Sequence, residues 1–343
     1  IDMDRSIINV VAKKDVLLFL PYHSFSFIIR FIREAAIDPT VLSIKISLYR
    51  VAKESRIISA LINAAKNGKA VTVVVELQAR FDEENNIQWT NRLRAEGVKV
   101  IHGVEGLKVH SKICLITRRE GKKTKDYAIV GTGNFHEGTA KLYTDYQLLT
   151  SDKRITKEIA QVFEFFRANY LQFNYDHIIV SPHHTRAKLI GLVDQEIENA
   201  KKGLPSGITL KMNSLSDLAM IDKLYEANRY GVKIKLIVRG ICSIIPQVPG
   251  FSENIEAISI VDRYLEHSRV FVFTNAGEPK YYISSADWMN RNIDYRVEVA
   301  VPIYDKRIQK QLHDHLHIMW LDNVKSRVLN QEQDNAYKKH LTN

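Results

Sequence analysis

The sequence predicts an α/β protein of two tandem domains, each a mostly parallel mixed sheet flanked by helices. Apolar runs of strand length alternate with helical segments throughout the chain. The pattern also begins twice, because Pro21 and Pro182 each end an apolar run and lie 161 residues apart (182 − 21), as do His23 and His184 (184 − 23). A repeat of this length indicates two domains, since solenoid repeats are only roughly 20 to 50 residues long.

The elements of the first half are expected in the order strand, helix, strand, helix, strand, hairpin and helix. The strands are apolar runs bounded by turn residues or proline, and the helices are longer segments with a helical apolar pattern. Their ranges are 16–21, 24–38, 41–50, 57–68, 71–76, 106–146 and 152–166. In sheets of this kind, functional groups gather at strand ends and in the adjoining loops.

The second half repeats this order after a join that we expect near residues 166–177. Residues 220–239 match residues 57–76 without a gap, so Gly231 corresponds to Gly68, and each glycine is expected to end a helix. The matched elements differ in spacing by only a few residues, which indicates a tandem duplication. The predicted domains are residues 1–175 and 176–343.

Three histidines lie in the last predicted helix, which follows Pro302: His313, His315 and His317. Their spacing places only the outer pair on one face of a helix. We therefore assign them to the surface and not to a metal site.

The composition restricts the partners and the compartment. The 343 residues include 49 Lys and Arg against 39 Asp and Glu, and the net charge of +10 favours a polyanionic partner such as nucleic acid, anionic lipid or a phosphate polymer. No apolar stretch approaches the roughly 20 residues of a membrane span. Because the chain starts at Ile1 without a signal-peptide layout, we expect a fragment of a longer cytoplasmic protein, with peripheral membrane association left open. Cys114 and Cys242 lie in apolar runs, as expected for reduced core thiols.

Residues 106–146 contain the strongest candidate for a catalytic site. His110 and Lys112 alternate with apolar or small residues in a β-like run, so both polar side chains are expected on one face. The glycine-rich segment 131–134, which ends in Asn134, follows an apolar run, and glycine allows backbone N–H groups to approach an anion. The combination suggests a nucleophile beside a phosphate site, although a lone His-x-Lys is more often a solvated pair.

The same arrangement occurs again near the end of the chain. His267 and Arg269 repeat the pattern of a histidine and a cation, and residues 284–287 take the place of the glycine-rich segment. A carboxylate follows each segment at the same spacing: Asp145 lies eleven residues after Asn134 (145 − 134), and Glu298 lies eleven after Asp287 (298 − 287). Each half therefore offers an imidazole, a cation and a carboxylate.

Three arginines follow apolar β-runs directly: Arg50, Arg80 and Arg239. A guanidinium group at a strand end suits bidentate phosphate binding. Surface ion pairing is the alternative, and it is strongest for Arg80, which has acidic neighbours at 82–84.

The chain resembles a known family, the C-terminal catalytic half of the bacterial polyphosphate kinases, which is built from two phospholipase-D-like domains with an active-site cleft between them. The resemblance spans nearly the whole chain and rests on DPTVLSIKISLYR, VTVVVELQARFDEENN, GLKVHSK, GTGNFHEGTAKLYTDY, GLPSGITLK, VRGICSIIP, SIVDRYLEHSR and ISSADWMNRNIDYRVEV. One departure from the phospholipase D pattern is that Arg269 and Asp287 replace lysine and asparagine in the second half. A symmetric pair of nucleophiles is therefore not expected.

The resemblance implies roles for individual residues. His110 becomes the phosphohistidine, and Tyr143, Arg239 and His267 contact the ATP phosphates. Arg50 and Arg80 fall at positions linked to magnesium. A guanidinium has no lone pair for a hard cation, so we expect these two arginines to bind the phosphate oxygens that hold Mg²⁺.

The leading hypothesis is a polyphosphate kinase, an enzyme that reversibly transfers the γ-phosphate of ATP to the end of an inorganic polyphosphate chain. A free imidazole suits the nucleophile because its pKa near 6.5 leaves it largely neutral at cell pH. Lys112 is assigned to the catalytic residues as a cation that stabilises the transition state. Arg269 and Asn134 are assigned to phosphate binding, and His267 to phosphate binding or proton transfer. Asp145 and Glu298 are expected to orient the imidazoles.

The implied partners are ATP or ADP, inorganic polyphosphate, and N-terminal domains that complete the nucleotide site in the resembled family. Neither nucleic acid nor a transmembrane segment is expected, and a homo-oligomer is left open. No adenine pocket is recognisable, so we expect little discrimination between ATP and GTP. The alternatives are a phospholipase-D-type phosphodiesterase or nuclease, and a non-catalytic polyanion-binding module.

Overall fold

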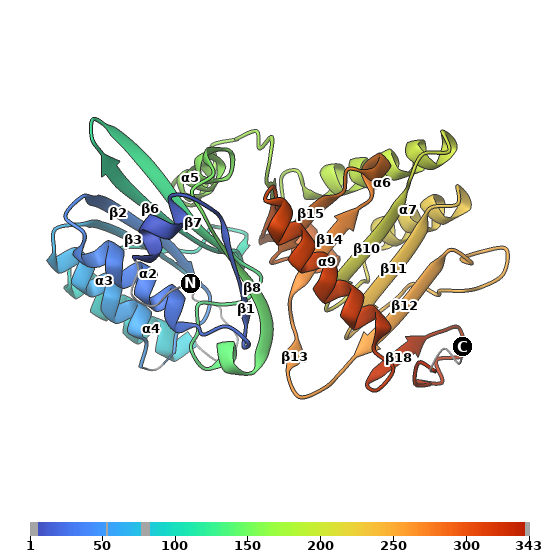
Figure 1. The fold of residues 1–343 in the computed structure, drawn as a ribbon. Coiled ribbons are helices and arrows are strands. Elements are labelled where there is room, and N and C mark those ends of the chain that lie inside the picture. Colours follow the sequence, from blue (N-terminus) through green and yellow to red (C-terminus); the bar gives the residue numbers. More distant parts are fainter. Residues whose placement is uncertain (1–5, 53, 77–82, 340–343) are drawn as a thin grey trace. The chain divides into compact units, whose positions relative to one another are not determined.

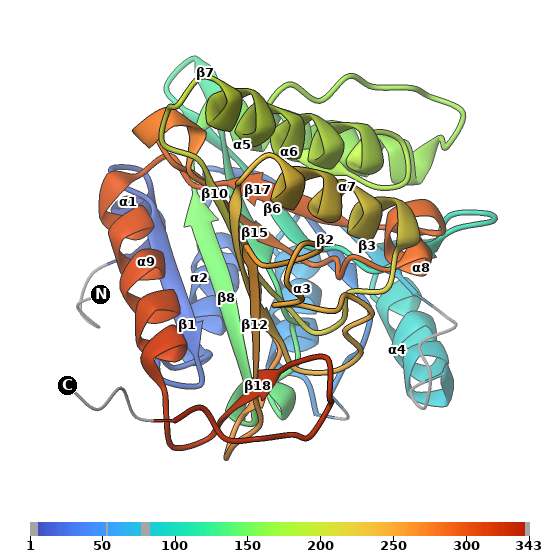
Figure 2. The same cartoon turned by 90° about the vertical axis from the view of Figure 1, so that its right-hand side faces the viewer.

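The computed structural model describes residues 6–52, 54–76 and 83–339. The chain divides into two compact units, Ile1–Ile178 and Ile179–Asn343. Each unit contains a mixed sheet with helices packed against it (Figures 1 and 2). Within the described residues, no helix is long and apolar enough to cross a membrane.

The first unit contains one large sheet with the strand order β1-β8-β7-β6-β2-β3-β4. The core packs α2 and α3 against the apolar face of the central strands, where Ile44, Ile46 and Val73 are fully buried. The elements are α1 (Ile7–Val11), β1 (Val16–Leu20), α2 (Ser26–Ile37), β2 (Val41–Leu48), α3 (Arg56–Lys66), β3 (Ala70–Val75), α4 (Glu83–Ala95), β4 (Lys99–His102), β5 (Lys108–Val109), β6 (Lys112–Glu120), β7 (Lys123–Gly131), a 3₁₀ turn (Thr139–Lys141), β8 (Tyr143–Thr150) and α5 (Lys153–Arg167).

The second unit repeats this plan with the strand order β18-β12-β11-β10-β14-β15-β17-β9. Helices α6 and α7 lie side by side on one face of its sheet (Figure 2). The elements are β9 (Ile179–Val180), α6 (Thr185–Lys201), β10 (Gly207–Met212), α7 (Leu218–Arg229), β11 (Lys233–Val238), β12 (Ile255–Ile260), β13 (Leu265–Glu266), β14 (Arg269–Phe273), a 3₁₀ turn (Asn275–Gly277), β15 (Lys280–Ser284), α8 (Asn290–Asp294), β16 (Arg296–Val297), β17 (Val299–Pro302), α9 (Lys306–Leu321) and β18 (Ser326–Leu329).

The predicted α/β class with two mixed sheets is confirmed, but the expected excess of parallel pairing is wrong. Among the sheet pairs of the described strands, only β2-β3-β4 in the first unit and β10-β11-β12 in the second are parallel. Helices α3, α4 and α7 connect β2 to β3, β3 to β4 and β10 to β11, and a loop connects β11 to β12. The remaining named pairs within each sheet are antiparallel. The difference arises because the strands beyond β2, in the order β6, β7, β8 and β1, extend the sheet through antiparallel pairs, and the expected hairpin β6–β7 is only one of these pairs.

Both cysteines are free thiols, as expected from the sequence. Burial raises the pKa of Cys114, which is fully buried, and raises that of Cys242 to about 11. Both thiols are therefore protonated at neutral pH, and neither is a candidate nucleophile.

Candidate functional site

The backbone on both sides of His110 is held by two buried polar side chains. The N–H of Val109 donates to Oε2 of Glu76 at 2.8 Å, and Glu76 is only 5% exposed. On the other side, the buried hydroxyl of Ser47 donates to the carbonyl of Ser111 at 2.8 Å and accepts from the N–H of Ile113. His110, between β5 and β6, is half-buried on this fixed support.

Tyr49 is a neighbour of His110 that the sequence analysis missed. The two rings meet edge to face, with centroids 5.0 Å apart and planes at 83°. Three cations also lie around the Tyr49 ring: Nζ of Lys112 at 5.4 Å, Nζ of Lys108 at 5.8 Å and the guanidinium carbon of Arg50 at 5.9 Å from its centroid. The only sequence signal was the position of Tyr49 at a strand end, directly before an arginine. The ring brings an imidazole and several cations together.

Lys112 is placed differently from His110. The lysine side chain is 2% exposed, and its ammonium donates to the backbone carbonyl of His110. The buried ammonium group of Lys112 is therefore bound to the backbone of the nucleophile candidate, His110. The imidazole, in contrast, remains partly accessible.

The glycines of segment 131–134 are required by packing against β8. A Cβ on Gly133 would lie 1.9 Å from Oδ2 of Asp145, and a Cβ on Gly131 would lie 2.1 Å from Oε1 of Gln147. The hydroxyl of Thr132 donates to Oδ1 of Asp145 at 2.6 Å. These contacts leave no space for a side chain at either glycine. Close packing therefore explains why both residues are glycine, and no bound anion is needed to explain them.

The second unit contains the same hydrogen bonds 153 residues later. Ser285 takes the place of Thr132, and its hydroxyl donates to Glu298. In each unit the residue after the carboxylate donates its N–H to this hydroxyl: Tyr146 to Thr132 at 3.0 Å, and Val299 to Ser285 at 3.1 Å. Glu298 also accepts from Nδ2 of Asn292 at 2.6 Å. The duplication inferred from the sequence thus extends to individual hydrogen bonds. In these contacts Asp145 and Glu298 bind the segments 131–134 and 284–287 and not an imidazole. Orientation of the imidazoles by the two carboxylates stays a prediction.

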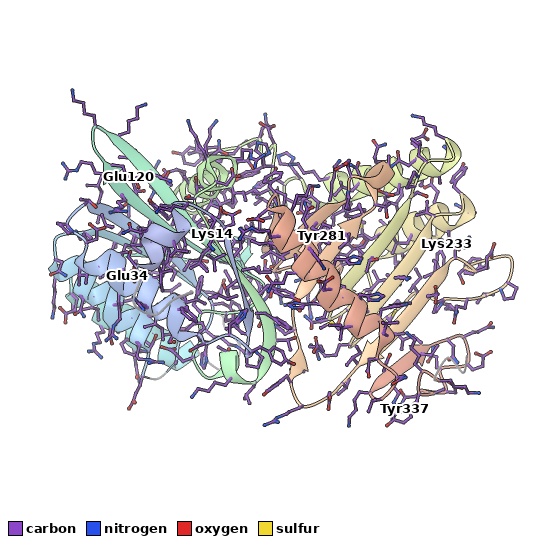
Figure 3. The ribbon with its side chains drawn as sticks, viewed as in Figure 1. Lys14, Glu34, Glu120, Lys233, Tyr281 and Tyr337 are labelled. Atoms are coloured by element: carbon purple, nitrogen blue, oxygen red, sulfur yellow. The ribbon has the colours of Figure 1, made fainter. Side chains whose placement is uncertain are left out.

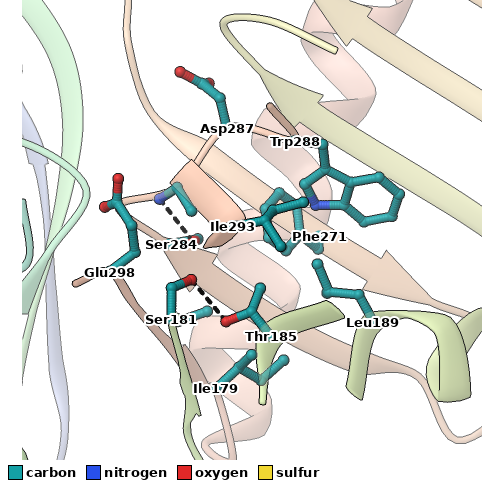
Figure 4. Close-up of a pocket in the computed structure, with 12 residues that line it drawn as sticks. Ile179, Ser181, Thr185, Leu189, Phe271, Ser284, Asp287, Trp288, Ile293 and Glu298 are labelled. Atoms are coloured by element: carbon teal, nitrogen blue, oxygen red, sulfur yellow. Dashed lines mark hydrogen bonds between the residues drawn. The ribbon is translucent and has the colours of Figure 1, made fainter. Parts of the chain in front are cut away.

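Figure 4 shows a small cavity beside this second loop, with Ser284, Asp287 and Glu298 at its edge. Its volume is about 10 Å³. A water molecule needs about 10 to 15 Å³ by the same measure, so the cavity is too small for a nucleotide or a phosphate chain.

The ion pair of Arg269 and Asp287 distinguishes the segment 284–287 of the second unit from the segment 131–134 of the first. The guanidinium binds both carboxylate oxygens, at 3.2 Å and 3.1 Å, and the two residues are 3% and 6% exposed. Burial alone raises the pKa of Asp287, but the charge and hydrogen bonds of Arg269 and the N–H of Asn213 outweigh it and lower that pKa to about 2. The same guanidinium donates to the carbonyl of His267 at 2.7 Å, with Nη1 3.3 Å from the imidazole Nε2.

Arg239, at the end of β11, is fixed to the chain segment that carries His267. Its Nε donates to the carbonyl of Glu266 at 2.8 Å, and its Nη2 donates to Oδ1 of Asn213 at 2.8 Å. Behind this segment, the 2% exposed Lys211 pairs with the carboxylate of Glu266 at 3.0 Å. The cation and the imidazole of the second unit are therefore positioned together.

The remaining predicted site residues of the first unit are Tyr143, Asn134 and Arg80. Tyr143 is half-buried at the start of β8, and Asn134 has a buried Oδ1 without a hydrogen-bond partner among the described residues. Arg80 lies outside the described residues. Within the described part of the chain, no group of three or more His, Cys, Asp or Glu side chains could hold a metal ion.

Two family models match the chain. The model of polyphosphate kinase C-terminal domain 1 matches residues 6–172, and the model of polyphosphate kinase C-terminal domain 2 matches residues 178–343. The polyphosphate kinase of Salmonella typhimurium is 54% identical over 97% of the chain, and that of Klebsiella pneumoniae is 52% identical over 98%. The chain spans about half of each of these relatives, 48% and 49% of their lengths.

Solved structures support the same relationship. A crystal structure of polyphosphate kinase from Porphyromonas gingivalis superposes with a TM-score of 0.93 and 38% identity, over 99% of this chain and 52% of that one. Phosphatidylserine synthase from Haemophilus influenzae has a TM-score of 0.60 at 10% identity, over 93% of this chain and 89% of that one. At this low identity the second similarity shows the fold alone, an α/β fold with two mixed sheets as expected from the sequence.

Proposed function

The chain belongs to the polyphosphate kinase family, and from this membership we propose that it carries the phosphoryl-transfer site for reversible transfer of the ATP γ-phosphate to inorganic polyphosphate. His110 is the nucleophile in this proposal. The observation that carries the assignment is the environment of its ring: a half-buried imidazole against Tyr49, with the ammonium of Lys112 bound to its own carbonyl.

The two histidines have different roles. Around His110, the lysine points to the backbone and the ring keeps an accessible side, as a nucleophile requires. His267 instead lies against a buried guanidinium that is already committed to Asp287. This asymmetry favours one phosphohistidine, with His267 in phosphate binding or proton transfer. It counts against a phosphodiesterase with two equivalent His-x-Lys loops.

The reaction balances in two steps. A ring nitrogen of His110 donates its lone pair to the γ-phosphorus, the bond to the β,γ-bridging oxygen breaks, and ADP leaves with that electron pair. A terminal oxygen of polyphosphate then attacks the phosphohistidine, and the P–N bond breaks to return the pair to the imidazole. Little covalent chemistry is left for other residues, so positioned cations supply most of the stabilisation of the transition state.

The proposed cations are Arg50, Lys112, Arg239 and Arg269, together with Arg80 from outside the described residues. Mg²⁺ enters as part of the substrate, Mg-ATP. The residues present fit this arrangement, because guanidinium groups bind phosphate oxygens and the described residues offer no carboxylate cluster of their own for the metal. Phosphate contacts alone do not read the base, so the proposal does not extend to nucleobase recognition.

Labelling with γ-³²P ATP tests the proposal. We expect an acid-labile, base-stable phosphoenzyme that polyphosphate discharges. His110→Ala should abolish the label and keep the melting temperature within a few degrees, because a half-buried ring at a loop contributes little packing. His267→Ala should slow turnover and retain part of the label. Wild-type labelling in His110→Ala would contradict the nucleophile assignment, and an unlabelled wild type under these conditions would contradict the phosphohistidine route.

A further inference from the structure

A groove lies between α9 and the sheet of the second unit, away from the candidate catalytic loops. Its volume is about 90 Å³, and its floor includes Ile237 of β11 and Val272 of β14. Figure 3 shows Tyr281 of β15 beside this helix. One water needs about 10 to 15 Å³, and pockets for drug-sized ligands begin near 300 Å³, so the groove suits a small ion or the end group of a longer ligand.

Hydrogen-bond donors from several elements converge on the groove. His313 and His317, one turn apart on α9, present parallel rings with centroids 6.1 Å apart, and Nδ1 of His313 lies 3.5 Å from the hydroxyl of Tyr281. No carboxylate is among the residues that line the groove in the described chain. The nearby Asp314 of α9 is paired with Lys310 at 2.7 Å.

Two ammonium groups lie beside one indole ring at the rim of the groove. The ammonium groups of Lys235 and Lys338 lie 5.1 Å and 4.9 Å from the ring centroid of the same indole, Trp320. Burial lowers the pKa of Lys338, the carboxylates of Glu256 and Asp322 oppose this effect, and the charge of Lys235 lowers the pKa further. Two like charges therefore repel each other beside one aromatic ring. A bound anion would relieve this repulsion.

We propose that this groove binds a phosphate anion, either orthophosphate or the terminal phosphate of a polyphosphate chain. The ammonium of Lys235 supplies the charge, and the imidazoles of His313 and His317 and the hydroxyls of Tyr281 and Thr209 supply hydrogen bonds. The site is separate from the phosphoryl-transfer residues. Lys235 lies in β11 four residues before Arg239, which corresponds to a distance of roughly 13 Å along an extended strand. The proposal does not depend on the phosphohistidine.

Long-range ¹H–¹⁵N spectra of the imidazoles provide a local test, because the catalytic site also attracts phosphate. We expect orthophosphate or tripolyphosphate, added at constant ionic strength, to shift the His313 and His317 signals in a saturable way. Lys235→Met and His313→Gln should raise the dissociation constant at this site about tenfold or more, as expected for loss of a charge-assisted hydrogen bond. In His313→Gln, the His317 signals report binding.

Lys233→Met and His315→Gln are matched controls, since each removes the same group from the same element but neither residue lines the groove. Saturation by orthophosphate assigns the site to the free ion, and saturation by tripolyphosphate alone assigns it to a chain end. The proposal is overturned if neither ligand shifts the two histidines, or if the groove variants weaken binding no more than the controls.

Discussion

Replacing Asp287 with asparagine removes the charge that neutralises buried Arg269 and changes the shape of the site very little. The pKa of Asp287 falls from 3.8 to about 2, which corresponds to about 2 kcal/mol of stabilisation of the folded state by the ionised carboxylate. Because the folded-state pKa is the lower one, this contribution is complete above pH ~4 and is lost as the pH falls towards 2. At pH 7 the variant lacks all of it.

The expected loss of unfolding free energy at pH 7 is about 3 to 5 kcal/mol, because the variant also leaves Arg269 buried without a counter-charge. Urea unfolding followed by the fluorescence of Trp288 measures it, since this fully buried residue is the next one along the chain. The matched control is Asp305→Asn, whose partner Arg307 has a 62% exposed side chain and whose helix-capping role asparagine preserves. The control should lose less than about 1 kcal/mol. Equal losses in the two variants would refute the argument.

Three further predictions follow from the first unit. Tyr49→Leu should slow phosphoenzyme formation about threefold to thirtyfold in single-turnover labelling, because the ring that faces three cations is lost, and Tyr49→Phe should stay near wild type. Gly133→Ala should lower the melting temperature by several degrees, because the new methyl group would lie 1.9 Å from an oxygen of Asp145; Gly191→Ala, with nothing within 4 Å, should not lower it. Arg50→Lys should reduce catalytic efficiency about tenfold to hundredfold at limiting Mg-ATP, and an unchanged value would make this arginine structural.

The sequence by itself determined the duplication, the α/β class and the histidine loops. These features depend on local patterns: runs of apolar residues, a glycine at the end of a helix, and a histidine followed by a cation two residues later. Pro21 and Pro182, or His110 and His267, can be matched without knowing what either residue contacts. The resemblance to polyphosphate kinases depends on the same kind of information, which is why the sequence alone indicates the family.

Only the tertiary structure decided which groups meet. Tyr49 contacts His110 across 61 residues (110 − 49), and no local pattern marks Tyr49. Local patterns mark Arg269 and Asp287, but not that the two residues pair across 18 residues (287 − 269). Strand direction was misjudged for a similar reason, because an antiparallel hairpin and a parallel crossover can share the same apolar alternation. The glycines beside Asp145 were read as an anion loop, and the structure explains them by close packing. Hydrogen bonds and packing depend on positions in space, and those are fixed only when distant strands come together in one sheet.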